Sequence, residues 1–187
     1  MKPSEQLKAE HEAILVMLAV LEKICGKLER RETIPPTHLP DILEFFQVFA
    51  DKCHHAKEEE FLFPAYQSVG IPKEGGPIGC MLAEHQEGRE AIAVMKAGLA
   101  ALEKEGPARF VTHARHYMAL LTAHIDKENE ILFPMGDAAL PQNRQAALLA
   151  DFDRLEETRI GPGKHEAFHR LIETLEAEHL RHSINAR

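Results

Sequence analysis

Apolar residues recur at three- and four-residue steps along most of the chain, and this spacing predicts amphipathic helices. The first segment shows it clearly, with Leu7, Ile14, Leu18 and Leu21 in step behind Ser4, a residue that favours the start of a helix. Segments rich in proline and glycine interrupt the pattern. The predicted helices cover about residues 5–31, 39–66, 77–104, 108–133, 141–157 and 164–182.

The first four predicted helices are long and are joined by short breaks. A helix of about 25 residues would span roughly 38 Å at about 1.5 Å per residue. No alternating pattern typical of strands competes with them. The sequence therefore predicts an all-α, up-down-up-down four-helix bundle over residues 1–135. Residues 136–187 are predicted to form a helical extension packed on the bundle.

An eleven-residue pattern occurs twice in the chain, 70 residues apart. Residues 54–64 read HHAKEEEFLFP and residues 124–134 read HIDKENEILFP, with seven identical positions. Each copy carries a histidine and a glutamate at positions i and i+4, which point the same way from a helix. Each copy therefore offers one imidazole and one carboxylate to a shared interior.

A shorter repeat supplies the other half of this set. Ala-Glu-His occurs at residues 9–11 and again at residues 83–85, each time in the helix before an eleven-residue pattern. The chain is therefore interpreted as two similar halves. Together they offer six candidate metal ligands: His11, His54, Glu58, His85, His124 and Glu128.

These six residues are predicted to meet at one end of the bundle. In an antiparallel bundle the odd helices must carry their ligands near their starts and the even helices near their ends. His11 lies roughly 9 Å inside its helix, and Glu58 lies roughly 12 Å before the end of its own. The Leu-Phe-Pro that follows each pattern is expected to seal the site from water, with proline ending or kinking the helix.

The donor set limits the chemistry. Imidazole nitrogens and carboxylate oxygens suit iron, manganese or zinc, and no thiolate is present among them. If both glutamates bridge two metals, each ion receives four bonds from the protein. Two iron ions would then need a bridging oxide or hydroxide and would keep an open position for O2, peroxide or NO. A structural zinc site would instead close its shell with four ligands.

Net charge and cysteine content limit the binding partners and the cellular compartment that can be expected. The net charge of −8 argues against nucleic acid as a partner. The three cysteines form no CxxC pair, which favours a reducing compartment. No signal peptide and no apolar stretch long enough to span a membrane is visible. A cytoplasmic protein is therefore expected.

Other residues near the motifs permit a different choice of ligands. His55 and Glu59 form the same i, i+4 pair one residue out of register, about 100° round the helix. Alignment of the two repeats favours His54 over His55, so His55 is interpreted as a surface residue or as support for a ligand. Glu10 and Glu84 are interpreted in the same way.

Four further features have a structural and a functional interpretation. Tyr117 lies near the face of His124 and is interpreted as core, with a hydrogen bond near the metals as the alternative. His113 is too far along the helix for the same site and is interpreted as a buried polar or interface residue. His165 and His169 can form a surface metal pair, although a solvated helix face is favoured. Cys53 is interpreted as a small core residue.

The order His, HxxxE, His, HxxxE, with KEE or KEN and LFP following, resembles the hemerythrin-like HHE cation-binding domains. The resemblance covers roughly residues 5–135, and residues 160–170 (IGPGKHEAFHR) resemble the tail of bacterial members. It implies a four-helix bundle with a diiron centre, less often with another metal, in an intracellular bacterial protein.

The chain differs from the oxygen-carrying hemerythrins at two positions. Those proteins have a second histidine one turn after the first on the third helix, where this chain has Arg89, and HxxxxD where this chain has HxxxE. The difference implies a more open site. Binding or sensing of O2, NO or iron is therefore expected. Oxidation or reduction of peroxide, O2 or NO with an unidentified electron-transfer partner is the first alternative, and a structural or iron-storage bundle is the second. The extension can form a homodimer surface.

Overall fold

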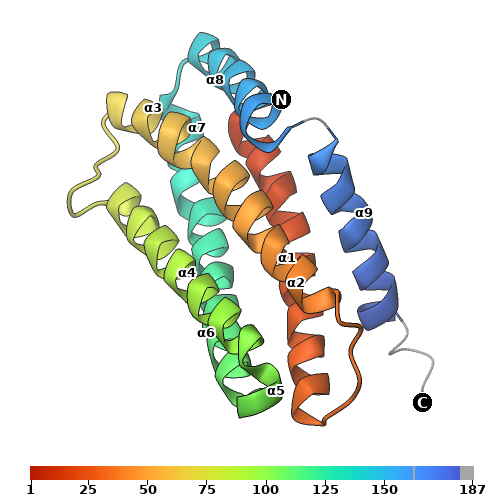
Figure 1. Ribbon diagram of the computed structural model, residues 1–187. Helices are drawn as coiled ribbons and strands as arrows, with labels where there is room; N and C mark the ends of the chain where they lie inside the picture. The colour runs from red at the N-terminus through yellow and green to blue at the C-terminus, as the bar shows by residue number, and fades with distance from the viewer. Residues whose placement is uncertain (162, 182–187) are drawn as a thin grey trace.

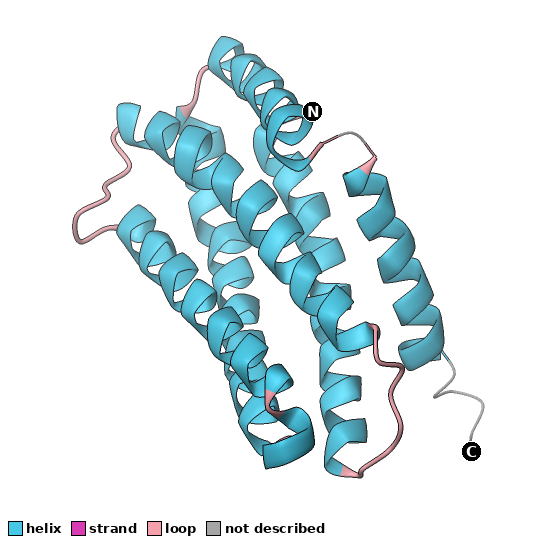
Figure 2. Cartoon of the chain, in the orientation of Figure 1, coloured by secondary structure: helices cyan, strands magenta, loops and turns pink. Residues whose placement is uncertain are grey.

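The computed structural model describes residues 1–161 and 163–181, and every regular element within these ranges is helical (Figure 2). The last predicted helix extends to residue 182, which lies outside the described residues. The all-α prediction is confirmed for the part of the chain that is described.

Four long helical segments form the bundle. The first is α1 (Pro3–Glu29). The second is continuous from α2 (His38–Phe45) through the π-helical segments η1 (Phe46–His55) and η2 (Glu58–Leu62) to α3 (Phe63–Ser68). The third is α4 (Pro77–Ala100), with the short α5 (Leu102–Glu105) behind it. The fourth comprises α6 (Ala108–Lys127), η3 (Glu128–Leu132) and α7 (Phe133–Ala139).

The four segments alternate in direction, as Figure 1 shows. The segment α1 and the α2–α3 segment form one antiparallel pair, and α4 with the α6–α7 segment forms the other. The helices α4 and α6 pack against each other, and α1 packs against α6. The predicted up-down-up-down bundle is the observed one.

The first helix begins two residues earlier than a serine cap at Ser4 would require. Pro3 occupies its first turn, where a missing N–H costs nothing. The hydroxyl of Ser4 instead donates to the carboxylate of Asp137, at 2.8 Å from its Oδ1 atom. The predicted helix-capping role of Ser4 is therefore wrong, and the residue joins the start of α1 to α7.

The residues after the bundle form α8 (Gln142–Leu155), η4 (Glu156–Ile160), α9 (Lys164–Glu176) and η5 (Ala177–Arg181). In Figure 1, α8 lies at the end of the bundle where α3 and α7 end, and α9 runs along the side. The helix α8 contacts α1 and η2, and α9 contacts α1. Phe168 of α9 packs its ring edge-on against Phe45 of α2.

Two apolar clusters fill the interior at different depths. The larger one includes Ile14, Ala91 and Ile125, and the other, at the end covered by α8, includes Leu7 and Met81. Leu7 and Ile14 lie on either side of His11 along α1, and Met81 and Ala91 lie on either side of His85 along α4. The candidate ligands therefore occupy a polar layer between two apolar layers.

The helices continue past Pro64 and Pro134, which the sequence analysis expected to end or kink them. Each proline follows a π-helical turn, in which the N–H of Phe63 donates to the carbonyl of Glu58 and that of Phe133 to the carbonyl of Glu128. A wider turn accommodates a residue that cannot donate to the helix ladder. The fourth segment therefore ends at Ala139 rather than near residue 133.

A close contact joins the two halves at the end of the bundle. Tyr66 and Gly136 occupy equivalent positions after the two Phe-Pro motifs, but the two residues differ greatly in size. The Tyr66 ring fills the space beside Gly136, where an added Cβ would lie only 2.0 Å from the ring atoms Cε1 and Cζ. Glycine is therefore required at position 136 because the tyrosine ring occupies the space of a side chain.

We predict that Gly136→Ala destabilises the protein by about 1–3 kcal/mol, because the new methyl group overpacks a filled interior. Gly88→Ala is the matched control, since its Cβ would lie 3.5 Å from the nearest Tyr117 atom, an ordinary contact. Replacing a helical glycine in that way is expected to stabilise by about 0.5–1 kcal/mol. Chemical denaturation measures both. Equal stability of Gly136→Ala and the wild type would contradict the packing argument.

Candidate metal centre

The structure brings all six predicted ligands together in the polar layer. Each is at most 1% exposed, in contrast to the surface positions that charged and polar residues usually occupy. Two groups of side chains have donor atoms within 4.8 Å of one another. One group contains His11, His54, Glu58 and Glu128, and the other contains His55, Glu58, His85 and His124.

The Nε2 atoms of four histidines are directed at the two central carboxylates. Glu58 receives His54 at 3.5 Å on its Oε1 atom and His85 at 3.4 Å on its Oε2 atom. The two oxygens of Glu58 thus face one histidine from each group. A carboxylate in this arrangement could bind a cation with each of its oxygens.

Glu128 also lies close to two histidines, one in its own helical segment and one in α1. Its Oε2 atom lies 3.2 Å from Nε2 of His11 and 3.3 Å from Nε2 of His124. The i, i+4 spacing predicted from the repeat accounts for the contact within the helix, and antiparallel packing against α1 supplies the other.

Several of these buried atoms make no hydrogen bond within the described part of the chain. Both oxygens of Glu58, both of Glu128 and Nε2 of His11 are in this state. A buried polar atom without a partner costs about 1–3 kcal/mol, and a buried anion costs more. The donor set, its burial and its lack of protein partners fit one or two divalent cations between the carboxylates and the imidazoles.

The electrostatics support the same conclusion. Burial and the facing carboxylate of Glu128 raise the pKa of Glu58 well above its usual value. Burial lowers the pKa of His54 and of His85 to about 3, so both imidazoles are neutral near pH 7. Burial also opposes a charge on His124, but the carboxylates of Glu128 and Glu84 together outweigh burial and raise the pKa of His124 to about 9. A cation would take the place of that proton.

The Ala-Glu-His repeat also positions ligands through its glutamates. Nδ1 of His54 donates to Glu10 at 2.9 Å, and Nδ1 of His124 donates to Glu84 at 2.9 Å. These bonds place a proton on Nδ1 and direct Nε2 of each ring toward the central carboxylates, where it could bind a metal. Glu10 and Glu84, which the sequence left as surface or supporting residues, are supporting residues.

The other two histidines are held by the residue after each motif glutamate. Nδ1 of His85 donates to Glu59 at 2.7 Å, and Nδ1 of His11 lies 2.9 Å from Oδ1 of Asn129. Glu59 and Asn129 occupy equivalent positions in the two repeats. Glu59 is in turn bound by Arg89, at 3.0 Å, so the residue that replaces a histidine of the oxygen carriers supports the site from outside.

The repeated phenylalanines cover the ligands. The ring of Phe133 stacks on His11 with centroids 5.6 Å apart, and the ring of Phe63 stacks on His85 with centroids 5.9 Å apart. The sequence expectation that the Leu-Phe pair seals the site from water matches these contacts.

His55 is the residue whose position differs most from the sequence interpretation. It is 4% exposed, its ring stacks on His85 at 3.9 Å, and its nitrogens belong to the second group of donors. The structure therefore adds a seventh residue to the candidate set. Ile125 occupies the equivalent position in the second repeat, so comparing the repeats could not reveal His55.

The remaining candidates lie apart from the centre. Tyr117 is buried in the core against Phe46, as favoured, although its hydroxyl makes no hydrogen bond within the described residues. Cys53 is core, and burial raises the pKa of its thiol to about 12. His113 is half-buried away from both groups of donors. His165 packs on Phe49 at 5.4 Å, and no metal-binding group that includes it is present in the described part of the chain.

Two polar features escaped the sequence analysis. Tyr66 is fully buried, and its hydroxyl has no partner among the described residues. A separate group of donors contains His38, Glu178 and His179. There the Lys27 ammonium lies 2.9 Å from Nδ1 of His179, and Nε2 of His179 lies 3.0 Å from His38. Residues this far apart in sequence gave no motif.

Comparison with known protein families agrees with this geometry. The family model described as the hemerythrin HHE cation binding domain matches residues 2–136. The chain belongs to this family. The match covers all four bundle segments to within a few residues of the end of α7, and it makes the chain a metal-binding protein. A comparison with curated proteins and one with solved structures each returned no significant match.

Among the residues that the structure describes, no helix is both long enough and apolar enough to cross a membrane.

We predict that Glu58→Gln stabilises the metal-free protein by about 1–3 kcal/mol, because the amide avoids both the burial of a charge and the proton uptake that the raised pKa of Glu58 implies. The same change is expected to abolish the stabilisation that added metal gives the wild type. Denaturant unfolding with and without metal measures both effects. Glu130→Gln, at an exposed position two residues beyond Glu128, should change neither by more than about 0.5 kcal/mol. A less stable metal-free Glu58→Gln protein would contradict the electrostatic argument.

Proposed function

We propose that the chain is a nonheme diiron protein that binds or senses O2, NO or iron at an open dinuclear site. The observation that carries the proposal is the division of Glu58 between two groups of imidazoles, with one oxygen facing each group. A single ion would not need a carboxylate placed in this way.

The proposed ligands divide unequally between two positions. His11 and His54 would hold one ion, and His85 and His124, with His55 beside them, would hold the other. Glu58 and Glu128 would connect the two. The position beside His11 and His54 has fewer imidazoles, so it is the position where an exogenous ligand would bind.

Iron is favoured by the donors, although manganese and zinc can use the same set. When bound, two iron ions supply reversible electron transfer and open positions for small ligands. The protein excludes water with Phe63 and Phe133 and fixes the histidine tautomers with Glu10 and Glu84. Small diatomic molecules or peroxide are the proposed ligands, and the cytoplasm is the proposed location.

An oxidoreductase that consumes peroxide, O2 or NO is the alternative, with an electron-transfer partner still to be found. A structural or iron-storage bundle is the second alternative. All of these functions would use the same metal site. Of them, the oxidoreductase alone would convert its substrate repeatedly. Whether the chain acts as a homodimer is a separate question that sedimentation would answer.

The first experiment is iron content and the optical spectrum of protein purified in air, then reduced and exposed again to O2. We expect two irons per chain and absorption bands that bleach on reduction and return reversibly with gas. Immediate and irreversible oxidation with loss of added peroxide would favour the oxidoreductase. A spectrum insensitive to any added ligand would favour the structural or storage function. Absence of iron, or one tightly held zinc, would contradict the diiron proposal.

We also predict that Glu58→Ala or Glu128→Ala lowers bound iron to well under two per chain, because each variant removes a carboxylate shared by both positions. Metal analysis after anaerobic reconstitution measures it, and Glu130→Ala is the surface control. Two irons retained by both variants would contradict the bridging assignment.

A further inference from the structure

We propose that the C-terminal extension tunes the metal position beside His11 and His54 through a single carboxylate, Glu156, which acts as a positioning residue. The inference rests on the proposed function, because it concerns how tightly that position holds its ion. It assigns to residues outside the HHE domain match a direct connection to the metal centre.

The connection is a chain of three polar contacts. Nδ1 of His54 donates to Oε2 of Glu10 at 2.9 Å. Oε1 of Glu10 accepts from the ammonium of Lys57 at 2.6 Å. The same ammonium donates to Oε1 of Glu156, in the π-helical turn that follows α8. The side chain of Gln6 donates to that oxygen of Glu156 as well, at 3.3 Å.

The burial and the charge pairing of Lys57 both depend on the extension. Its side chain is 0% exposed, and Phe152 of α8 lies 5.8 Å from its ammonium. A buried ammonium is stable only when carboxylates neutralise it. Without Glu156, Glu10 would be the only carboxylate that pairs with the Lys57 ammonium while it also accepts from His54. Glu156 provides the ammonium with a second carboxylate. The extension thus covers Lys57 with a ring and pairs it with a carboxylate.

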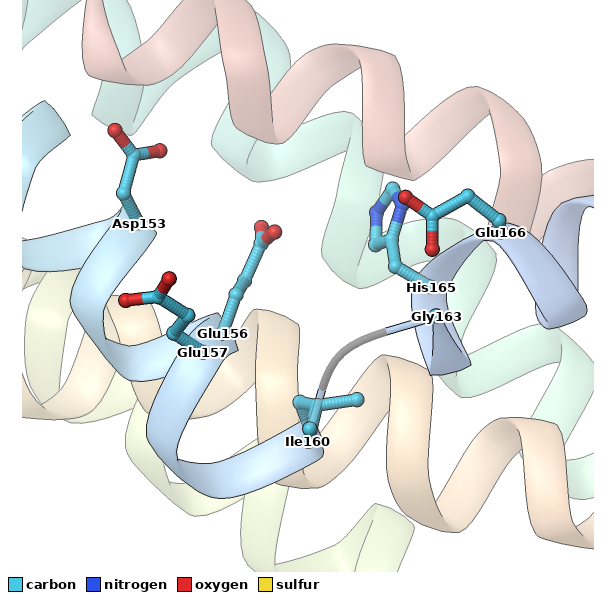
Figure 3. A pocket seen from close by; sticks show the side chains of 8 residues that line it. Asp153, Glu156, Glu157, Ile160, Gly163, His165 and Glu166 are labelled. Carbon is cyan, nitrogen blue, oxygen red and sulfur yellow. The ribbon is translucent and has the colours of Figure 1, made fainter.

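Glu156 occupies a position that is unfavourable without this pairing. It lines a pocket of about 300 Å³ with Asp153, Glu157 and Glu166, three other acidic residues of the extension. Figure 3 shows its side chain extending in a different direction from that of Glu157, its neighbour in the same turn. Like charges that line one pocket repel one another. Pairing with Lys57 offsets that repulsion and directs the carboxylate toward the bundle.

The second half of the bundle contains the same contacts without an extension. Lys127 pairs with Glu84, and Glu84 accepts from Nδ1 of His124 at 2.9 Å. Lys127 remains 37% exposed, and its other contact is a weak one to Cys80 at 4.0 Å. Both halves of the repeat therefore contain the same series of lysine, glutamate and histidine contacts. Of the two series, the one that ends at His54 is covered by α8 and continued by Glu156 of η4. An effect of Glu156 should therefore reach one metal position and not the other.

The test is release of Fe²⁺ from the fully loaded protein to an excess of a ferrous chelator, comparing Glu156→Gln with Glu157→Gln. Loss of a group that directly supports a ligand costs about ten- to a hundredfold in metal affinity. Since Glu156 acts two contacts further away, through Lys57 and Glu10, we expect one of the two irons to leave at least about threefold faster. The second iron should leave at the wild-type rate, and Glu157→Gln should leave both rates unchanged.

Two further measurements separate positioning from general loosening. Mössbauer spectra of ⁵⁷Fe-loaded protein should show one altered iron environment in Glu156→Gln and one that matches the wild type. The unfolding midpoint of the metal-free variant should lie only slightly below that of metal-free Glu157→Gln, because Glu10 still neutralises Lys57 and the amide oxygen of the new glutamine can still accept from its ammonium. Equal acceleration of both irons, or a lowered midpoint that accounts for the loss, would overturn the positioning role.

Unchanged release in Glu156→Gln, from a wild type that holds two irons, would overturn this inference and leave the proposed function intact. A wild type that holds fewer than two irons would overturn the proposed function and this inference with it.

Discussion

The fold is organised around two carboxylates that are buried opposite each other without a hydrogen-bond partner from the described residues. Glu58 and Glu128 are 0% exposed, and the interior of a helical bundle offers no solvent to stabilise them. Such a pair is tolerated only if protons or bound cations neutralise it. The surrounding imidazoles with Nε2 atoms directed at the pair, the carboxylates behind them and the stacked phenylalanines all follow from that requirement.

The same requirement connects all four helical segments. Each motif glutamate contacts a histidine in its own segment and one in another, so Glu58 joins the second segment to α4 while Glu128 joins the fourth to α1. The supporting contacts cross the bundle as well, as from Glu10 on α1 to His54. Cation binding would therefore fix the axial register of the segments, which apolar packing alone specifies less strictly.

The convergence of the six candidate ligands could be predicted because its signal is local. A histidine and a glutamate four residues apart share a helix face, and antiparallel order places the repeats at one end. His55 could not be found in this way. Its approach to His85 depends on which segments are neighbours and on π-helical turns, whose wider spacing departs from the ideal 100° per residue. The helices continue through Pro64 and Pro134 for the same reason.

The two halves share one sequence pattern, and the positions at which they differ give the two sides of the candidate metal centre different surroundings. His55 corresponds to Ile125, Glu59 to Asn129, and the covered Lys57 to the exposed Lys127. The first two differences place an additional imidazole and an additional carboxylate beside His85. In the proposed diiron site, the position at His11 and His54 would thus have fewer imidazoles but a more buried support. Such a site would bind a small ligand at one place, which a symmetric pair of halves could not specify.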